Sequence, residues 1–233
     1  MNEKIPTHVA IIMDGNRRWA KMRNKNSLDG HKAGAENLRK LGPYILSKGV
    51  KFLSVFAFST ENFKRSADEV KYLMDMIIYE FNHNAKVFMD KNVKVVFSGR
   101  REGLRDDVLK SMDNIEAKTK NNDGGILNIC INYGGQAEII DAIKNINKDV
   151  LSGKIELDSI DEDIVNHHLY QNLPPVDYMI RTSGEYRISN YMLWQLAYAE
   201  LLFADAFFPD FNSEEFDKAL EEYFLRERRY GGN

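Results

Sequence analysis

Short runs of apolar residues alternate along the chain with longer segments in which apolar residues recur every three or four positions. We predict strands at His8–Met13, Phe52–Phe58, Val93–Ser98, Ile126–Ile131, Tyr178–Arg181 and Leu201–Phe203. Several of these runs are continuously apolar, which is typical of parallel strands that are buried on both faces. The alternation of strands with helices predicts an α/β fold, in which helices surround a central, mostly parallel sheet.

Helix signals lie between the predicted strands. Ser66–Glu69 has the pattern of a capping box. The helix that follows has one apolar face, which consists of Val70, Leu73, Met74, Ile77 and Phe81. A second helix is predicted from near Gly34 to Gly49, with a kink or an interruption at Pro43 because proline lacks the backbone donor.

Two further helices are predicted near the end of the chain. Tyr191–Ala199 has the pattern of an apolar, aromatic helix that leads to Glu200, and a last helix opens at Asn212 and ends in Arg226–Arg229. The chain contains no internal repeat, low-complexity segment or linker. We therefore expect residues 1–233 to form a single domain.

The composition is that of an ordinary globular protein, and it restricts the classes of partner. Hydrophobic residues make up 43% of the chain and charged residues 29%, with a net charge of −3. This charge provides no overall attraction to nucleic acid, so a site for an anion has to be a local cluster of arginines.

Cysteine content and hydropathy bear on the cellular compartment. Cys130 is the only cysteine, which excludes an intrachain disulfide and a cysteine-rich metal site. It lies in an apolar run, which favours a buried, inert thiol over a nucleophile. The first residues have too short an apolar stretch for a signal peptide, and no apolar run approaches the roughly 20 residues that span a bilayer. We therefore expect a cytoplasmic protein.

A polar island follows the first predicted strand and consists of Asp14, Gly15, Asn16, Arg17 and Arg18. Ligands of open α/β sheets bind at the carboxyl ends of strands, where this segment must lie. Gly15 permits a sharp turn, the two arginines have forked donors that suit phosphate oxygens, and Asp14 suits a divalent cation shared with phosphates. The alternative is an ordinary turn, in which Asp and Asn take their usual places.

Two further polar islands follow predicted strands. Ser59–Arg65 offers neutral hydrogen bonds at Ser59 and Asn62 and a cation at Arg65, although it could also be a loop that caps the next helix. Arg181–Asn190 combines two arginines with serines and a glycine, which suits a second diphosphate.

Two isolated ionisable residues allow a structural or a functional interpretation. Glu200 follows an otherwise apolar run, so its carboxylate is either a ligand or the partner of an arginine. His31 would ordinarily be a surface or capping histidine. His83, His167 and His168 have no metal-like companions and are interpreted as structural.

Together these segments resemble the cis-prenyltransferase family over nearly the whole chain. The matching segments, in order, are HVAIIMDGNRRWA, GHKAGAENLRK, FAFSTENFKRSADEV, INYGGQAEI and IRTSGEYRISNYMLWQLAYAELLFADAFFPDF. The ending RERRYGG is similar to the family's Arg-x-Gly tail. One such motif would be weak, whereas five long motifs in the correct order are specific.

The resemblance implies a magnesium-dependent transferase that condenses isopentenyl diphosphate with an allylic diphosphate such as farnesyl diphosphate. The product would be a cis-polyprenyl diphosphate such as undecaprenyl diphosphate, the precursor of a lipid carrier for cell-wall synthesis. It also implies an apolar tunnel for the prenyl chain and a homodimer. The partners would be the two diphosphates and a second copy of the chain, without nucleic acid and with a peripheral membrane contact for product release.

The resemblance also implies roles for residues. Asp14 and Asn62 would be catalytic, the first as the magnesium ligand and the second in removing a proton from the isopentenyl unit. Glu200 would be a second metal-associated carboxylate, and Arg229 and Gly231 would complete a site across the dimer. The substrate-binding residues would be Gly15, Asn16, Arg17, Arg18, Trp19, His31, Ser59, Thr60, Glu61, Phe63, Arg65, Arg181, Arg187, Ile188 and Ser189.

Two diphosphate sites follow from these roles. The first polar island and His31 would hold the allylic diphosphate, with Trp19 beside it. Arg181, Arg187 and Ser189 would hold isopentenyl diphosphate. Ionisation of the allylic diphosphate leaves negative charge on phosphate, which magnesium and preplaced arginines stabilise.

Some positions depart from residues that are frequent in the family. An arginine is frequent near the position of Ser27, a tryptophan at Phe63 and an arginine at Gln136. The loss of one arginine would weaken binding of the allylic diphosphate, for which Arg23 could compensate. The reaction class is unchanged by these departures. The alternatives are a relative that makes shorter or branched prenyl diphosphates, a non-catalytic partner subunit, and an unrelated phosphohydrolase. Retention of both Asp14 and Arg181 argues against the partner subunit.

The wall of the tunnel could be formed by residues that would serve equally as core, and for most of them we prefer the core. These residues are Phe52, Val55, Ala57, Leu73, Ile77 and Phe81. Ile131 shares a strand face with Leu127 and Ile129. If this face borders the tunnel, Ile131 narrows it and shortens the product; the preferred alternative is that Ile131 packs under a helix.

Overall fold

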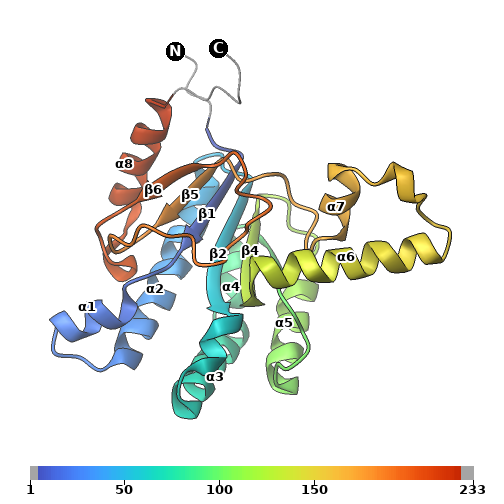
Figure 1. Ribbon diagram of the computed structural model, residues 1–233. Helices are drawn as coiled ribbons and strands as arrows, with labels where there is room; N and C mark the ends of the chain where they lie inside the picture. Colours follow the sequence, from blue (N-terminus) through green and yellow to red (C-terminus); the bar gives the residue numbers. More distant parts are fainter. Residues whose placement is uncertain (1–4, 227–233) are drawn as a thin grey trace.

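The structure, a computed structural model, describes residues 5–226 and is built on one sheet (Figure 1). Its six strands are β1 (His8–Ile12), β2 (Phe52–Ser59), β3 (Lys94–Ser98), β4 (Ile126–Tyr133), β5 (Tyr178–Arg181) and β6 (Glu200–Phe203). They are ordered β3-β4-β2-β1-β5-β6, and every neighbouring pair is parallel. The predicted α/β fold is confirmed, and each predicted strand agrees with the observed one to within two residues at either end.

Helices surround this sheet. The longer ones are α1 (Asn16–Met22), α2 (Ser27–Ser47), α3 (Ala67–His83), α4 (Ala85–Asp90), α5 (Asp106–Thr119), α6 (Gly135–Leu151), α7 (Glu162–His168) and α8 (Ser213–Phe224). Three short 3₁₀ helices are η1 (Thr60–Lys64), η2 (Leu157–Ser159) and η3 (Phe208–Asp210). Figure 1 shows α6 running outward from the end of β4, with α7 beside it. Within the described residues, no helix is both long and apolar enough to cross a bilayer.

The sheet separates two hydrophobic clusters, because successive side chains of a strand point to opposite faces. Val9 and Ile11 of β1 belong to the larger cluster, which also holds buried residues of α2, α3, α5 and α8. Ala10 and Ile12 belong to the smaller cluster, with Cys130 of β4. Cys130 is completely buried, and burial raises the pKa of its thiol well above the ordinary value, as an inert cysteine requires.

Two helix starts are set by side-chain caps. Asn26 accepts the backbone N–H of Asp29, and Asp29 accepts the N–H of Asn26, so α2 begins at Ser27 and earlier than predicted. The predicted interruption at Pro43 is wrong, since α2 continues through it. Ser66 accepts the N–H of Glu69 at 3.4 Å and caps α3, as predicted.

The end of the chain differs from the prediction in two ways. Helix α8 starts after its Asn212 cap, as predicted, but ends at Phe224. Tyr191–Ala199 is a series of turns and not a helix. Asn190 and Met192 have φ values of 61° and 42°, which interrupt a right-handed helix. The apolar side chains of this segment instead cover the smaller cluster as irregular structure.

Candidate active site

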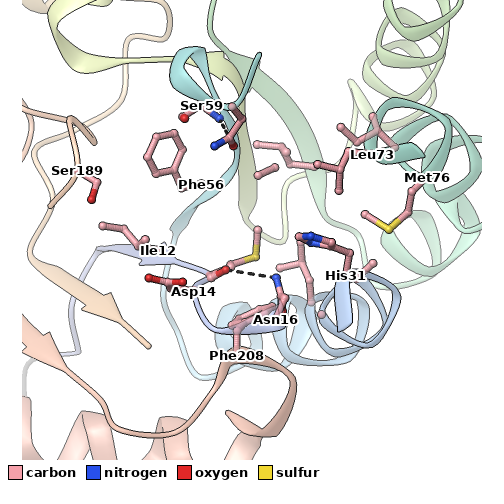
Figure 2. A pocket seen from close by; sticks show the side chains of 18 of the residues that line it. Ile12, Asp14, Asn16, His31, Phe56, Ser59, Leu73, Met76, Ser189 and Phe208 are labelled. Carbon is pink, nitrogen blue, oxygen red and sulfur yellow. Dashed lines mark hydrogen bonds between the residues drawn. The ribbon is translucent and has the colours of Figure 1, made fainter. Parts of the chain in front are cut away.

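The carboxyl ends of β1, β2 and β5 surround a cavity of about 670 Å³ (Figure 2). The chain passes from β1 to β2 on one side, whereas β5 is paired with β1 on the other side. Such a reversal of strand order opens a crevice at the carboxyl edge of a parallel sheet. The cavity therefore lies where an α/β sheet is expected to bind its ligand.

Asp14 and Gly15 make the turn that leads from β1 into α1. Gly15 has a φ of 98°, and a Cβ atom there would lie 2.6 Å from the ring of Phe207 and 2.8 Å from Ser183. Only glycine fits this turn without displacement of a neighbour. The N–H of Gly15 donates to Oδ1 of Asp14 at 2.6 Å, which fixes the carboxylate at the cavity.

Arg181 extends from the end of β5 into the same cavity and is 3% exposed. Its Nη2 donates to Oδ2 of Asp14 at 2.8 Å, and its Nη1 donates to Oγ of Ser189 at 2.8 Å and to the carbonyl of Arg187. Its buried Nε has no hydrogen-bond partner. Because a buried donor without a partner is costly, this atom is available to a ligand oxygen.

Arg18 lies on the other side of Asp14 at 3.5 Å and donates to Glu185 at 2.7 Å and to Ser183 at 2.6 Å. Arg187 pairs with Glu185 as well, and hydrogen bonding from Arg187 lowers the pKa of that carboxyl. The two arginines thus pair with carboxylates, and phosphate oxygens offer the same kind of acceptor.

Close contact between α1 and α2 places Asn16 and His31 against the cavity. A Cβ atom on Gly30 would lie 2.0 Å from the carbonyl of Asn16, and one on Gly34 would lie 2.5 Å from Oδ1 of Asn16. Oδ1 of Asn16 and Nε2 of His31 are buried without a hydrogen-bond partner. Figure 2 shows both side chains between Asp14 and the apolar part of the cavity. Both atoms can therefore hydrogen-bond to a polar group of a ligand.

His31 is neutral at physiological pH. Burial lowers its pKa to about 4, and the charge of Arg65 adds to this effect. The Glu69 carboxylate lies 3.7 Å from His31, 3.0 Å from Arg65 and 4.0 Å from Arg17, so these three basic side chains surround one acidic group.

The second island forms η1, which divides its side chains between two directions. Ser59, Glu61, Asn62 and Arg65 line the cavity. Oδ1 of Asn62 accepts the N–H of Ser59 at 3.0 Å, which caps η1 and leaves Nδ2 of Asn62 for a ligand. Thr60 and Phe63 of η1 instead line a different crevice, on the β3 and α6 side.

The remainder of the cavity wall is apolar. Of the candidate tunnel residues, Ala57, Leu73, Ile77 and Phe81 line the cavity. Leu73, Ile77 and Phe81 also belong to the core cluster, as preferred, and Ala57 packs against it, so these side chains serve the core and the cavity wall together. Figure 2 shows Leu73 and Met76 across the cavity from Asp14 and Ser189.

Three other residues that were considered for the tunnel wall do not line the cavity. Phe52 and Val55 do not line the cavity, and Val55 is fully buried in the core. Ile131 is 1% exposed and belongs to the core cluster, as in the preferred alternative, whereas Ile129 on the same strand face does line the cavity.

The structure places some predicted site residues outside the cavity. Gly15, Arg17 and Arg18 line an adjoining crevice that shares Asp14 with the cavity. Trp19 donates from Nε1 to Asp210 at 2.7 Å and lies under Arg23, which pairs with Asp210 as well. Arg23, which was expected to compensate for a missing arginine, therefore does not line the cavity. Ile188 packs against the smaller hydrophobic cluster. Arg229 and Gly231 lie outside the described residues.

Glu200 does not lie beside Asp14 within one chain. It starts β6 in register with Tyr178, which is level with Val9 at the opposite end of the sheet. Asp14 is five positions after Val9, which corresponds to about 16 Å along a strand. Glu200 pairs instead with Arg226 at 3.1 Å. The sequence did not indicate this because the level of Glu200 depends on how β6 pairs with β5.

Sequence reasoning missed two residues that organise the site. Glu69 was assigned only to a helix cap, although its spacing of four from Arg65 was a signal for an ion pair. Asn190 lines the cavity and bonds to Glu61 at 3.0 Å. Its polar position at the end of the third island was the only local signal.

Asp14 is suited to a divalent cation that arrives with a diphosphate. Its side chain is 29% exposed and faces the cavity. Magnesium is usually bound by one or two carboxylates together with substrate phosphates and waters. In the part of the chain that the structure describes, no group of three or more His, Cys, Asp or Glu side chains could hold a metal. The site therefore fits a cation whose coordination is completed by substrate oxygens.

Comparison with known proteins agrees with this geometry. Residues 12–231 match the model of a prenyltransferase family described as "Putative undecaprenyl diphosphate synthase". The chain is 47% identical to an isoprenyl transferase of Fusobacterium nucleatum, over 100% of this chain and 98% of that protein. It is 43% identical to a ditrans,polycis-undecaprenyl-diphosphate synthase ((2E,6E)-farnesyl-diphosphate specific) of Legionella pneumophila, over 99% and 98%.

A solved structure extends the comparison to the fold. Lavandulyl diphosphate synthase from Lavandula x intermedia, determined in complex with dimethylallyl diphosphate, matches with a TM-score of 0.94 and 32% identity, over 97% of this chain and 98% of that one. The protein is thus a prenyltransferase. The chain belongs to the undecaprenyl diphosphate synthase family.

Proposed function

We propose that the protein lengthens an allylic diphosphate by condensing it with isopentenyl diphosphate, and that the product is a cis-polyprenyl diphosphate. One observation carries the proposal: a single cavity joins a cluster of arginines and Asp14 to an apolar wall. An allylic diphosphate has the same two parts, a polyanionic end and a hydrocarbon chain. The name of the Legionella relative supports farnesyl diphosphate as the primer and undecaprenyl diphosphate as the product.

The reaction begins when the bond between C1 of the primer and its diphosphate breaks. Negative charge then develops on the leaving diphosphate, and donors already in place stabilise it without reorganisation. Arg18 and Arg65 are held in place by Glu185 and Glu69. Neutral His31 adds a hydrogen-bonding ring beside them, in a crevice that shares Asp14 and Asn16 with the cavity. Magnesium, held by Asp14 and phosphate oxygens, would supply further neutralisation of the leaving group.

The second diphosphate would lie against Arg181, Arg187 and Ser189. In this position its isopentenyl carbon C4 can form the new bond to C1, after which C2 loses a proton. Nδ2 of Asn62 would hold the water or diphosphate oxygen that takes this proton, since Oδ1 is engaged by the N–H of Ser59. The apolar wall would receive the growing chain, with Leu73, Ile77 and Phe81 forming part of a tunnel.

We also propose a homodimer whose interface includes β6. This strand is an edge of the sheet, and exposed apolar side chains lie on it and near it, at Tyr186 (76%), Tyr198 (70%) and Leu201 (37%). An open edge with exposed apolar residues suits association with a second copy. Glu200 on β6 would then face the dimer interface, where it could serve a metal site that it does not reach within its own chain. The cytoplasmic location and the membrane contact stay predictions.

The proposal is tested by incubating purified protein with labelled isopentenyl diphosphate and either geranyl or farnesyl diphosphate, with and without magnesium. Products are sized by chromatography after removal of phosphate. We expect long cis products that require the cation and decrease in excess chelator. Branched or single-condensation products would instead indicate a relative that makes shorter or branched prenyl diphosphates, and absence of any transfer would reject the proposal.

A further inference from the structure

Asn190 lies where the three polar islands meet. It follows Ser189 at the end of the segment after β5, lines the cavity and has a φ of 61°. A positive φ is uncommon for residues other than glycine, and asparagine is one of those that adopt it most readily. This backbone conformation directs both its carbonyl and its side chain toward the neighbouring segments.

Both oxygens of Asn190 accept backbone donors from the start of α6. The carbonyl accepts the N–H of Gly135 at 2.7 Å, and Oδ1 accepts the N–H of Gln136 at 2.9 Å. The N-cap of α6 is Gly134, which has no side chain to accept the first helical donors. Asn190 therefore caps α6, although it lies more than 50 positions further along the sequence.

The amide nitrogen of Asn190 is used as well. Nδ2 donates to Oε1 of Glu61 at 3.0 Å. Glu61 lines the cavity beside Asn62, and hydrogen bonds that include the one from Asn190 outweigh the effect of its partial burial and lower the pKa of Glu61. Because Oδ1 already accepts from Gln136, the amide can present only its nitrogen to Glu61.

Gly134 provides the space for this contact. A Cβ atom at residue 134 would lie 2.8 Å from Nδ2 of Asn190 and 2.8 Å from Oγ1 of Thr60. The glycine thus allows the start of α6, η1 and the segment after β5 to approach one another. Ser189, the neighbour of Asn190, accepts from Arg181 at 2.8 Å, so the same junction reaches the arginine at the cavity.

We propose that Asn190 is a positioning residue that holds Ser189 and Glu61 in register at the end of the cavity assigned to isopentenyl diphosphate. It acts through backbone caps on α6 and one hydrogen bond to Glu61. This inference rests on the proposed function for its kinetic readout, but the junction itself can be tested without substrate.

The kinetic test replaces the amide donor of Asn190, which bonds to Glu61, by a second acceptor. Asn190→Asp keeps an oxygen for Gln136 but places a second carboxylate against Glu61. We expect the KM for isopentenyl diphosphate to rise at least ten-fold at pH 8, with little change in the KM for the allylic primer, and to recover several-fold relative to wild type as the pH falls toward 5.5. Asn147→Asp, the same change on the exposed face of α6, serves as the matched control and should match wild type.

Rescue provides the decisive comparison. In the double variant Asn190→Asp with Glu61→Gln, the amide of residue 61 can donate to the carboxylate of residue 190, which restores the bond with its direction reversed. We expect its KM to be at least five-fold below that of Asn190→Asp. A double variant no better than Asn190→Asp, or an Asn190→Asp variant that matches wild type while wild type elongates normally, would overturn the proposal.

Amide hydrogen exchange tests the junction independently of activity. In Asn190→Ala the carbonyl of residue 190 remains, so the N–H of Gly135 should stay protected, whereas the N–H of Gln136 should exchange at least ten-fold faster. Equal protection of the Gln136 N–H in wild type and in Asn190→Ala would contradict the structural basis of the proposal, even if no prenyl transfer were detected.

Discussion

Arg181 donates to the carboxylate of Asp14 over 2.8 Å, although 167 positions separate the two residues in the sequence. The pair joins the end of β5 to the end of β1 at the cavity. Only 4% of the Arg181 side chain is exposed, against 29% for Asp14. The buried guanidinium depends on the carboxylate for a counter-charge, so the residue assigned to the metal also contributes to the fold.

Replacement of Asp14 by Ala should therefore abolish turnover and also lower the free energy of unfolding. A loop carboxylate alone would contribute little to the core, but here its loss leaves a buried donor group with fewer partners, at a cost of about 1–3 kcal/mol. The bonds of Arg181 to Ser189 and to the Arg187 carbonyl remain, which limits the loss. Denaturant unfolding and a prenyl-transfer assay measure the two effects.

Asp14→Asn serves as the matched variant, because it keeps an oxygen that can accept from Arg181 and loses only the charge. We expect it to be inactive but closer to wild type in stability. Turnover that survives either substitution, or that persists in excess chelator, would refute the metal role of Asp14.

Arg187→Ala should weaken isopentenyl diphosphate without unfolding the protein. The Arg187 side chain is 57% exposed and pairs with Glu185, so its removal exposes no buried charge. Loss of one charged hydrogen bond corresponds to about 1.5–3 kcal/mol, or roughly a ten-fold or greater rise in KM. The control is Arg101→Ala. Arg101 pairs with Asp113 away from the cavity, so this change should leave the KM unchanged. Arg181→Ala should raise the KM as well but also destabilise the fold. An unchanged KM in both cavity variants would remove the assignment.

Asn62→Asp separates the structural role of Asn62 from its catalytic role. The variant keeps an oxygen for the N–H of Ser59, so the cap of η1 and the melting temperature should change little. It loses the Nδ2 donor and adds negative charge beside a diphosphate, so kcat should fall by at least ten-fold. A decrease in melting temperature that accounts for the lost activity would mean that Asn62 is only a cap.

His8 should make the stability dependent on pH. The ring is fully buried, with Nδ1 2.7 Å from the carbonyl of Pro174 and Nε2 2.8 Å from Oγ of Ser54, and burial lowers its pKa from 6.5 to about 4. Between these values the unfolded chain binds the proton and the folded chain does not. Stability therefore falls as the pH drops through this window, by about 2 kcal/mol per such histidine from pH 7 to pH 5.

Urea unfolding at several pH values measures this dependence. His31, whose pKa is also lowered to about 4, adds a contribution of the same sign. His8→Asn should therefore flatten the pH profile in part, whereas His167→Asn on the exposed end of α7 should not. A His8→Asn profile that is parallel to wild type would contradict the burial argument.

The strands could be predicted from the sequence because parallel strands buried on both faces are apolar throughout, whatever their partners. The failures have a different origin. Tyr191–Ala199 has the apolar content of a helix, but backbone groups beside it are satisfied from other segments, as when Asn190 accepts the N–H of Gly135. The position of Glu200 could not be predicted either, because its place along the strand direction follows from the pairing of β6 with β5 at Tyr178 and not from its sequence neighbours.

The polar islands could be placed together because carboxyl ends of parallel strands share one edge of the sheet. Which side chains of an island reach the cavity could not be predicted, because that depends on local turns. Asn62 and Thr60 are two residues apart, yet η1 directs the first into the cavity and the second toward another crevice.

The last prediction concerns product length, which depends on which residues of β4 border the cavity. Ile129 and Ile131 are on the same face of the strand, and both are almost completely buried, at 4% and 1% exposure. Only Ile129 lines the cavity. Ile129→Ala should therefore enlarge the space for the prenyl chain and shift the products of a farnesyl diphosphate incubation toward longer chains. Ile131→Ala should leave the distribution as in wild type and lower stability by about 2–5 kcal/mol, as expected for a truncated core residue. Chromatography of the products and denaturant unfolding of both variants distinguish the two positions. If Ile131→Ala lengthens the products and Ile129→Ala does not, the chain follows a different path from the cavity described here.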